Sequence, residues 1–241
     1  MENFENNFNI QSSGTQSLSK TFVSTVFLWM FAALGITALT AYLFGTSESL
    51  FKTLINTETG SLSFLGWIVM FAPFAIVLIM SMGNDRLSVT SMVLMYVLYS
   101  ILMGMSLSFI FMAYSSASIF KTFIITSVMF GLMAFVGYTT KTDLTRFGSI
   151  LMMALVGIIV ASIVNFFMHS TQLEYIVSIL GVLIFTGLTA WDVQKIKRIG
   201  ESGIVQGEAT AKLTIFAALS LYLDFLNLFL YLLRFFGNSK N

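Results

Sequence analysis

A polar stripe in the final apolar segment, residues 213–233, is the pattern in this sequence that most suggests chemistry. The segment carries one carboxylate, Asp224, at its midpoint. At helical spacing Asp224 shares one face with three other polar residues, Ser220, Asn227 and Tyr231. An ionised Asp at a bilayer centre costs about 2.5 to 3.5 kcal/mol, so such a residue typically faces a bundle interior and marks an ion or proton path. The alternative interpretation is a polar stripe that only holds helices together.

A second carboxylate, Asp192, lies in the segment GLTAWDVQKIKR, beside a cluster of basic residues. Taken alone, it predicts a local ion pair with Lys195, worth about 0.2–0.5 kcal/mol. A short polar connection joins its segment to the final one, so the two are expected to be antiparallel neighbours. Two carboxylates that approach each other titrate as a coupled pair. The sequence therefore predicts a proton-sensitive site formed by Asp192 and Asp224.

The sequence offers more than one counter-ion for this pair. Arg86 follows the second apolar run and is expected to emerge on the same side as Asp192. Its alternative interpretation is an ordinary basic loop residue. Lys141 and Arg146 are rival partners, and Asp143 in the same loop is able to neutralise either of them.

Other kinds of active site find no support, and we expect the protein not to be an enzyme and to use no cofactor. The sequence has no cysteine and one histidine, His169, so thiolate or histidine metal sites are not expected. It contains no Gly-rich phosphate loop, GxSxG or HExxH. Intramembrane aspartyl proteases also use two carboxylates, but Trp191 and Leu223 precede the aspartates where Tyr-Asp and Gly-x-Gly-Asp motifs are expected.

The composition identifies the elements that carry these residues as membrane spans. Hydrophobic residues make up 57% of the 241 residues and charged residues 10%, and the mean hydropathy is +0.89, far outside soluble averages. A formal net charge of +1 gives no reason to expect nucleic acid as a partner. Apolar runs near the roughly 20 residues that a span needs predict an all-α integral membrane protein with seven transmembrane helices, at 22–44, 64–82, 89–114, 122–140, 147–167, 175–191 and 213–233.

The distribution of basic residues predicts a cytoplasmic N-terminus and an external C-terminus, because Lys and Arg concentrate on the cytoplasmic side. In that orientation eight of the 12 lie inside: Lys20, Arg86, Lys141, Arg146, Lys195, Lys197, Arg198 and Lys212. A last segment that re-enters without crossing would put both termini inside. Residues 1–19 are polar and expected to form a flexible tail, before one transmembrane domain over 20–237 and a short tail over 238–241.

Two stretches of the sequence resemble the Bax inhibitor family, the transmembrane Bax inhibitor motif proteins found from bacteria to animals, and look like its bacterial members. They are TAWDVQKIKR at 189–198 and ALSLYLDFLNLFLYLLRFFG at 218–237, and the seven-span layout agrees over 20–237. Trp191 stands where Tyr was expected, which does not affect Asp192. The resemblance implies two three-helix layers around a central C-terminal helix, and a place in the bacterial inner membrane.

The resemblance also implies a function: a pH-sensitive calcium leak, gated by protonation of an aspartate pair that matches Asp192 and Asp224. In that family an arginine near the end of the second helix closes the path, and Arg86 is its positional equivalent here. Ca²⁺ takes about six to eight oxygen ligands, so these carboxylates with Asn227 and a hydroxyl would hold it weakly, as a permeant ion. The expected partners are the lipid bilayer, Ca²⁺ and protons. The alternative is a non-conducting membrane regulator of stress responses, or of a membrane-embedded protease as partner.

Overall fold

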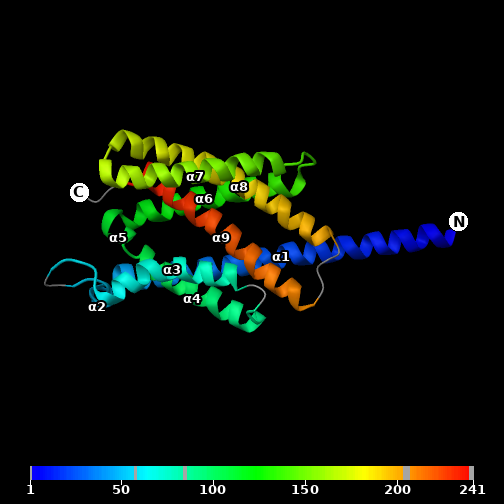
Figure 1. Cartoon of the computed structure of the whole chain (residues 1–241), viewed down its shortest axis with the longest axis horizontal. Coiled ribbons are helices and arrows are strands. Elements are labelled where there is room, and N and C mark those ends of the chain that lie inside the picture. The colour runs from blue at the N-terminus through cyan, green and yellow to red at the C-terminus, as the bar shows by residue number, and fades with distance from the viewer. Residues whose placement is uncertain (1, 57–58, 84–85, 203–206, 239–241) are drawn as a thin grey trace.

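The computed structural model describes residues 2–56, 59–83, 86–202 and 207–238, and for residues 2–18 the helical backbone only. Within these ranges, seven stretches are long and apolar enough to cross a membrane, and α4 and α5 together form the third of them. The predicted all-α fold with seven candidate spans is confirmed (Figure 1). The helices are α1 (Glu2–Thr46), α2 (Glu48–Leu54), α3 (Phe64–Met82), α4 (Val89–Leu107), α5 (Ile110–Ala113), α6 (Ser116–Thr139), α7 (Thr145–Met168), α8 (Thr171–Glu201) and α9 (Glu208–Phe236).

Serine caps begin several of these helices, just before the chain enters an apolar run. The hydroxyls of Ser63, Ser88, Ser115 and Ser170 accept hydrogen bonds from backbone N–H groups in the first turns of α3, α4, α6 and α8.

The helix α8 continues past Trp191, where its apolar run stops, to Glu201. Asp192 therefore lies well inside a helix rather than near its end.

The helix α1 begins well before the first predicted span. The backbone of residues 2–19, predicted to be a flexible tail, continues the helix of the first span and projects beyond the bundle (Figure 1). A helix that is already nucleated extends at little cost, and Gly14 is the single glycine of this stretch. The flexibility of the tail stays a prediction. Of the predicted tail at 238–241, all but Asn238 lies outside the described residues.

The centre of the bundle is formed by α8 and α9 together. The most apolar windows of both helices are 61% buried, against 39% or less for the other spans. α9 contacts α1, α4, α6 and α8, while α8 contacts α1, α6, α7 and α9. The arrangement of two layers around a single central helix stays a prediction, because α8 is as enclosed as α9.

Glycines allow α6 and α7 to approach the outer face of α8 closely. A Cβ atom on Gly137 of α6 would overlap the backbone carbonyl of Ala190 on α8. One on Gly148 of α7 would overlap the ring of Trp191. The Ala190 carbonyl is a backbone atom that cannot rotate away, so this contact fixes the distance between α6 and α8, while at α7 the Trp191 ring occupies the space that the missing side chain of Gly148 leaves.

The bundle has two ends, which we name by one residue each. At the Arg198 end, the α6–α7 loop lies against the last turns of α8, and the Ser19 hydroxyl of α1 donates to the Lys197 carbonyl at 3.5 Å. At the His169 end, α7 ends and α8 begins. α9 runs from the Arg198 end to the His169 end (Figure 1). Which end faces the cytoplasm stays a prediction.

Candidate functional site

The two predicted aspartates meet between α8 and α9. The Ser220 hydroxyl on α9 donates a hydrogen bond to Asp192 Oδ2 on α8 at 2.5 Å. The carboxyl group of Asp224, one turn further along α9, lies within hydrogen-bonding reach of that of Asp192. Both side chains are buried, with 8% of Asp192 and 6% of Asp224 exposed. The structure thus brings together two carboxylates that are 32 positions apart in the sequence.

One oxygen of this pair has no hydrogen-bond donor. In the part of the chain that the structure describes, Asp224 Oδ2 is buried and unpartnered. An ionised carboxylate only accepts hydrogen bonds, so the contact between Asp192 and Asp224 becomes a hydrogen bond only when one of them carries a proton. An unsatisfied buried acceptor costs about 1–3 kcal/mol. A proton or a cation between the two carboxyl groups would satisfy it.

The opposite face of α9 is held by a cluster of buried hydroxyl groups that the sequence analysis did not identify. The Tyr222 hydroxyl and Thr37 Oγ1 of α1 are 2.8 Å apart, and Thr37 donates to the Ser100 carbonyl of α4 at 2.9 Å. The rings of Tyr96 and Tyr99 pack edge-on against that of Tyr222. These contacts set the rotation of α9, and so direct Asp224 toward α8. Sequence spacing gives no signal for them, because they join three distant helices.

A cavity of about 500 Å³ leads from the His169 end toward this pair. It lies between α7, α8 and α9, and its α9 wall includes Asn227 and Tyr231, which share a face with Asp224. Asn227 donates to the Leu223 carbonyl of its own helix at 2.8 Å through its amide nitrogen, and its amide oxygen accepts no hydrogen bond from the described residues. Glu174 and Arg234, an ion pair at 3.4 Å, also line the cavity. The predicted stripe therefore divides: Ser220 and Asp224 meet Asp192, while Asn227 and Tyr231 line the cavity.

Within the described residues, none of the predicted counter-ions forms an ion pair with Asp192 or Asp224. Arg86 is exposed in the turn before α4, and no ion pair within the described ranges involves it. Lys195, predicted to pair with Asp192, instead has its ammonium 5.3 Å from the centre of the Trp191 ring. The rivals Lys141 and Arg146 are exposed in and after the α6–α7 loop. Residues 84–85, which directly precede Arg86 in the sequence, lie outside the described residues.

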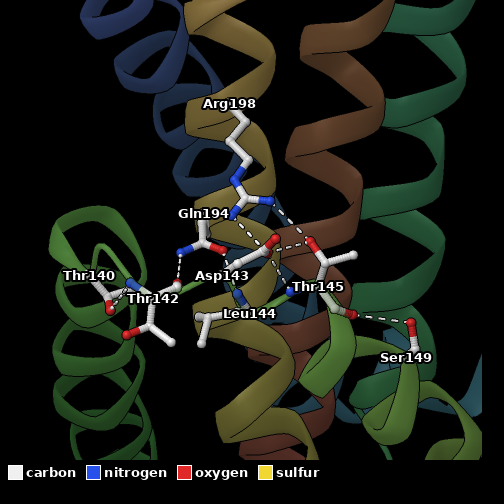
Figure 2. A network of polar contacts seen from close by, with 8 residues as sticks. All are labelled: Thr140, Thr142, Asp143, Leu144, Thr145, Ser149, Gln194 and Arg198. Atoms are coloured by element: carbon white, nitrogen blue, oxygen red, sulfur yellow. Dashed lines mark hydrogen bonds and ion pairs between the residues drawn. The ribbon is translucent and has the colours of Figure 1, made fainter.

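The α6–α7 loop is tied to α8 by a polar network that the sequence analysis missed (Figure 2). Asp143 accepts hydrogen bonds from the hydroxyl and backbone N–H of Thr145 and pairs with Arg198 of α8 at 2.8 Å. Gln194 of α8 binds two backbone groups of the same loop. An amide that binds backbone groups leaves no pattern in the sequence of the loop that it binds, so the sequence shows only a neutral polar residue, Gln194, two positions after Asp192.

This network predicts an acid-sensitive loop. Hydrogen bonds from Thr145 and the charge of Arg198 hold the pKa of Asp143 well below its ordinary value of 3.8. A carboxyl group whose pKa is lowered by folding contributes stability above its ordinary pKa, and that contribution is lost as the pH falls below it. Hydrogen exchange in residues 140–145, corrected for intrinsic rates, should therefore accelerate as the pH falls below 3.8. An Asp143→Asn variant should exchange faster already at neutral pH, and an acid response equal to that of the parent would contradict the prediction.

Comparison with known proteins identifies relatives over nearly the whole chain. A family model described as "Inhibitor of apoptosis-promoting Bax1" matches residues 19–241. Inner membrane protein YbhL of Escherichia coli K12 is 42% identical over 222 residues, which cover 92% of this chain and 93% of YbhL. Uncharacterized protein RP147 of Rickettsia prowazekii is 40% identical over 236 residues, 94% of this chain and 96% of that protein. An uncharacterized protein of Borreliella burgdorferi is 43% identical over 93% of this chain and 94% of its own.

Proposed function

Because this chain belongs to the Bax inhibitor family of membrane proteins, we propose that it is a pH-sensitive leak that lets Ca²⁺ cross the membrane down its gradient. The observation that carries the proposal is the buried pair of Asp192 and Asp224, one of whose oxygens lacks a donor. Ionisable groups inside a membrane bundle are costly and mark ion or proton paths. The name of the Escherichia coli relative favours the bacterial inner membrane as the location.

The proton is the proposed switch. When the pair holds one proton, the two carboxyl groups share it, and the Ser220 hydroxyl completes the cluster. When both carboxyl groups are ionised they repel each other, and Asp192 then needs a cationic partner. Arg86, which follows α3, is the proposed partner in that state, where it would draw α3 inward and close the path. Protonation removes the charge that holds Arg86, so acid opens the path.

The packing of α3 supports a movement of this kind. Its main neighbour among the described elements is α4, whereas α9 touches four helices. A helix held chiefly by one neighbour moves at a lower cost than one enclosed on all sides. Arg86 is exposed in this structure. That position agrees with the proposed state in which the aspartate pair is protonated and the arginine is released.

The cavity at the His169 end supplies the proposed route for the ion. Its wall at Asn227 is one turn from Asp224, so an ion in the cavity is close to the carboxylate pair. Two carboxylates, one amide oxygen and a hydroxyl are fewer oxygens than the roughly six to eight that Ca²⁺ takes. Water would complete the shell, and weak, passing coordination suits conduction better than storage.

Purified protein in liposomes containing a Ca²⁺ indicator tests the proposal. Flux should follow the gradient and decrease about tenfold for each pH unit on the alkaline side of the midpoint, as expected for a switch with one proton. A Glu201→Gln variant, which removes an exposed carboxylate from the same helix as Asp192, should behave as the parent. Absence of flux at every pH over roughly 5 to 8 would exclude the leak and leave a non-conducting regulator.

A further inference from the structure

The oxygen and the nitrogen of the Gln194 side-chain amide both bind the α6–α7 loop. Its Oε1 accepts from the backbone N–H of Leu144 at 2.9 Å, and its Nε2 donates to the carbonyl of Thr142 at 2.8 Å. The side chain is only 5% exposed. Figure 2 shows the amide of Gln194 facing the loop, with one bond to the backbone of Thr142 and the other to the backbone of Leu144. A buried amide with both ends paired fixes the loop on α8.

Arg198, one turn later on α8, also binds the α6–α7 loop, on the more exposed side. It donates to Asp143 Oδ1 at 2.8 Å and to the hydroxyl of Thr145 at 3.0 Å (Figure 2). Lys197 donates to the Tyr138 carbonyl at the end of α6 at 2.9 Å. We call the contacts of Gln194 and Arg198 with residues 142–145 the loop latch. Its arginine half is exposed and screened by salt, whereas its glutamine half is buried.

The latch lies on the opposite face of α8 from the aspartate pair. Residues on a helix advance by about 100°, so Gln194 and Asp192 point about 200° apart. Ala190 and Trp191, which pack against glycines of α6 and α7, lie on the latch side with Gln194. Asp192 lies on the side that contacts Ser220 of α9. A rotation or slide of α8 that separated Asp192 from α9 would therefore strain both bonds of Gln194.

The latch itself does not change charge where the pair is expected to titrate. Asp143 stays ionised down to pH values below its ordinary pKa of 3.8, because Thr145 and Arg198 favour the charged form. The charged groups that act on Asp192 are Asp224 of α9 and Lys195 of α8, and within the described residues none comes from α1, α6 or α7. In the part of the chain that the structure describes, the charged group that acts on Asp224 is Asp192. The charge of the loop latch therefore stays constant over the pH range in which the aspartate pair is expected to titrate.

We propose that Gln194 is a positioning residue: the loop latch sets the rotation and depth of α8, and thereby the distance between the carboxyl groups of Asp192 and Asp224. Releasing the latch lets α8 move away from α9, and separated carboxyl groups no longer share a proton. The expected effect on the pH dependence of Ca²⁺ flux rests on the proposed leak. The expected effect on the protonation of Asp192 and Asp224 is independent of the leak.

The test is a Gln194→Met variant, which keeps the side-chain length but removes both hydrogen bonds to the loop. The protonated-carboxyl infrared band of the reconstituted protein, assigned with Asp224→Asn, reports the pair without any ion flow. Carboxyl groups that are further apart repel each other less and no longer share a proton, so the titration midpoint should shift by about one pH unit toward acid. The midpoint of Ca²⁺ flux should move by the same amount.

The matched control is Ser149→Ala, which removes a hydroxyl bond to the Thr145 carbonyl in the same network, a bond within α7 that involves no residue of α8. It should leave the infrared midpoint unchanged. If Gln194→Met does not fold, Arg198→Gln, which removes only exposed contacts, should give a smaller shift in the same direction. If the infrared midpoint of the variant that folds, Gln194→Met or Arg198→Gln, is the same as that of the parent, the proposal is overturned, whatever the Ca²⁺ flux of that variant. A shifted midpoint without flux in any variant supports the latch and rejects the leak.

Discussion

Replacing Asp192 by Asn is expected to leave Ca²⁺ flux within about twofold of its acid value over roughly pH 5 to 8, whereas flux through the parent protein falls about tenfold per pH unit above its midpoint. The physical reason is that an asparagine amide has nearly the shape of a protonated carboxyl group. It can donate to the unpartnered oxygen of Asp224 at every pH. The variant therefore resembles the protonated pair permanently and presents no charge to Arg86.

Flux into liposomes of matched protein content measures this effect, with Glu201→Gln as the charge control. Arg86→Ala extends the test: if Arg86 is the partner of ionised Asp192, this variant also stays open at alkaline pH. Loss of pH dependence in Asp192→Asn but not in Arg86→Ala would transfer the counter-ion role to Lys141 or Arg146. Full pH dependence in both variants would reject the aspartate switch.

Replacing Gly137 by Ala should destabilise the bundle by about 1–3 kcal/mol, the usual range for overpacking. The added methyl group would overlap the Ala190 carbonyl, a backbone atom of α8 that cannot rotate away. The helices α6 and α8 must then separate, which loosens the contacts near Lys197 and Gln194 as well. A thermal melt in detergent, followed by the fraction of protein that remains monodisperse, measures the loss.

The control for this substitution lies on the same helix. Gly131 of α6 has no neighbouring atom within 4 Å of an added Cβ, so Gly131→Ala makes the same chemical change in open space. Because Ala favours helix over Gly, this variant should be as stable as the parent or slightly more so. Equal losses in both variants would mean that the close approach of α6 and α8 is not the cause.

The membrane spans could be predicted because they depend on local properties of the sequence. A run of about 20 apolar residues identifies a span wherever its neighbours lie, and each of the seven predicted runs corresponds to one candidate span of the structure, the third being divided between α4 and α5. The helix ends were less predictable. The helix α8 extends past Trp191 because VQKIKRIGE has no proline and its single glycine, Gly200, lies next to its end, although the segment is too polar to count as membrane span.

The candidate site was predictable where one helix face carries the information. The common face of Ser220, Asp224 and Asn227 follows from helical spacing, and their neighbour Asp192 follows from the short connection between α8 and α9. The attachment of Gln194 was not predictable, since it binds backbone groups that every residue possesses. The contact of Tyr222 with Thr37 was equally hidden, because it joins helices far apart in the sequence.

The depth of Asp224 has an electrical consequence. The residue lies near the middle of the helix that spans the bundle, and the cavity reaches toward it from the His169 end only as far as Asn227. A proton that arrives at the pair from that end crosses about half of the transmembrane voltage, which is worth about 1.2 kcal/mol per 100 mV for one elementary charge. That energy equals almost one pH unit. An energised membrane therefore shifts the set point of such a switch, and a sensor of acidity at this depth is at the same time a sensor of membrane potential.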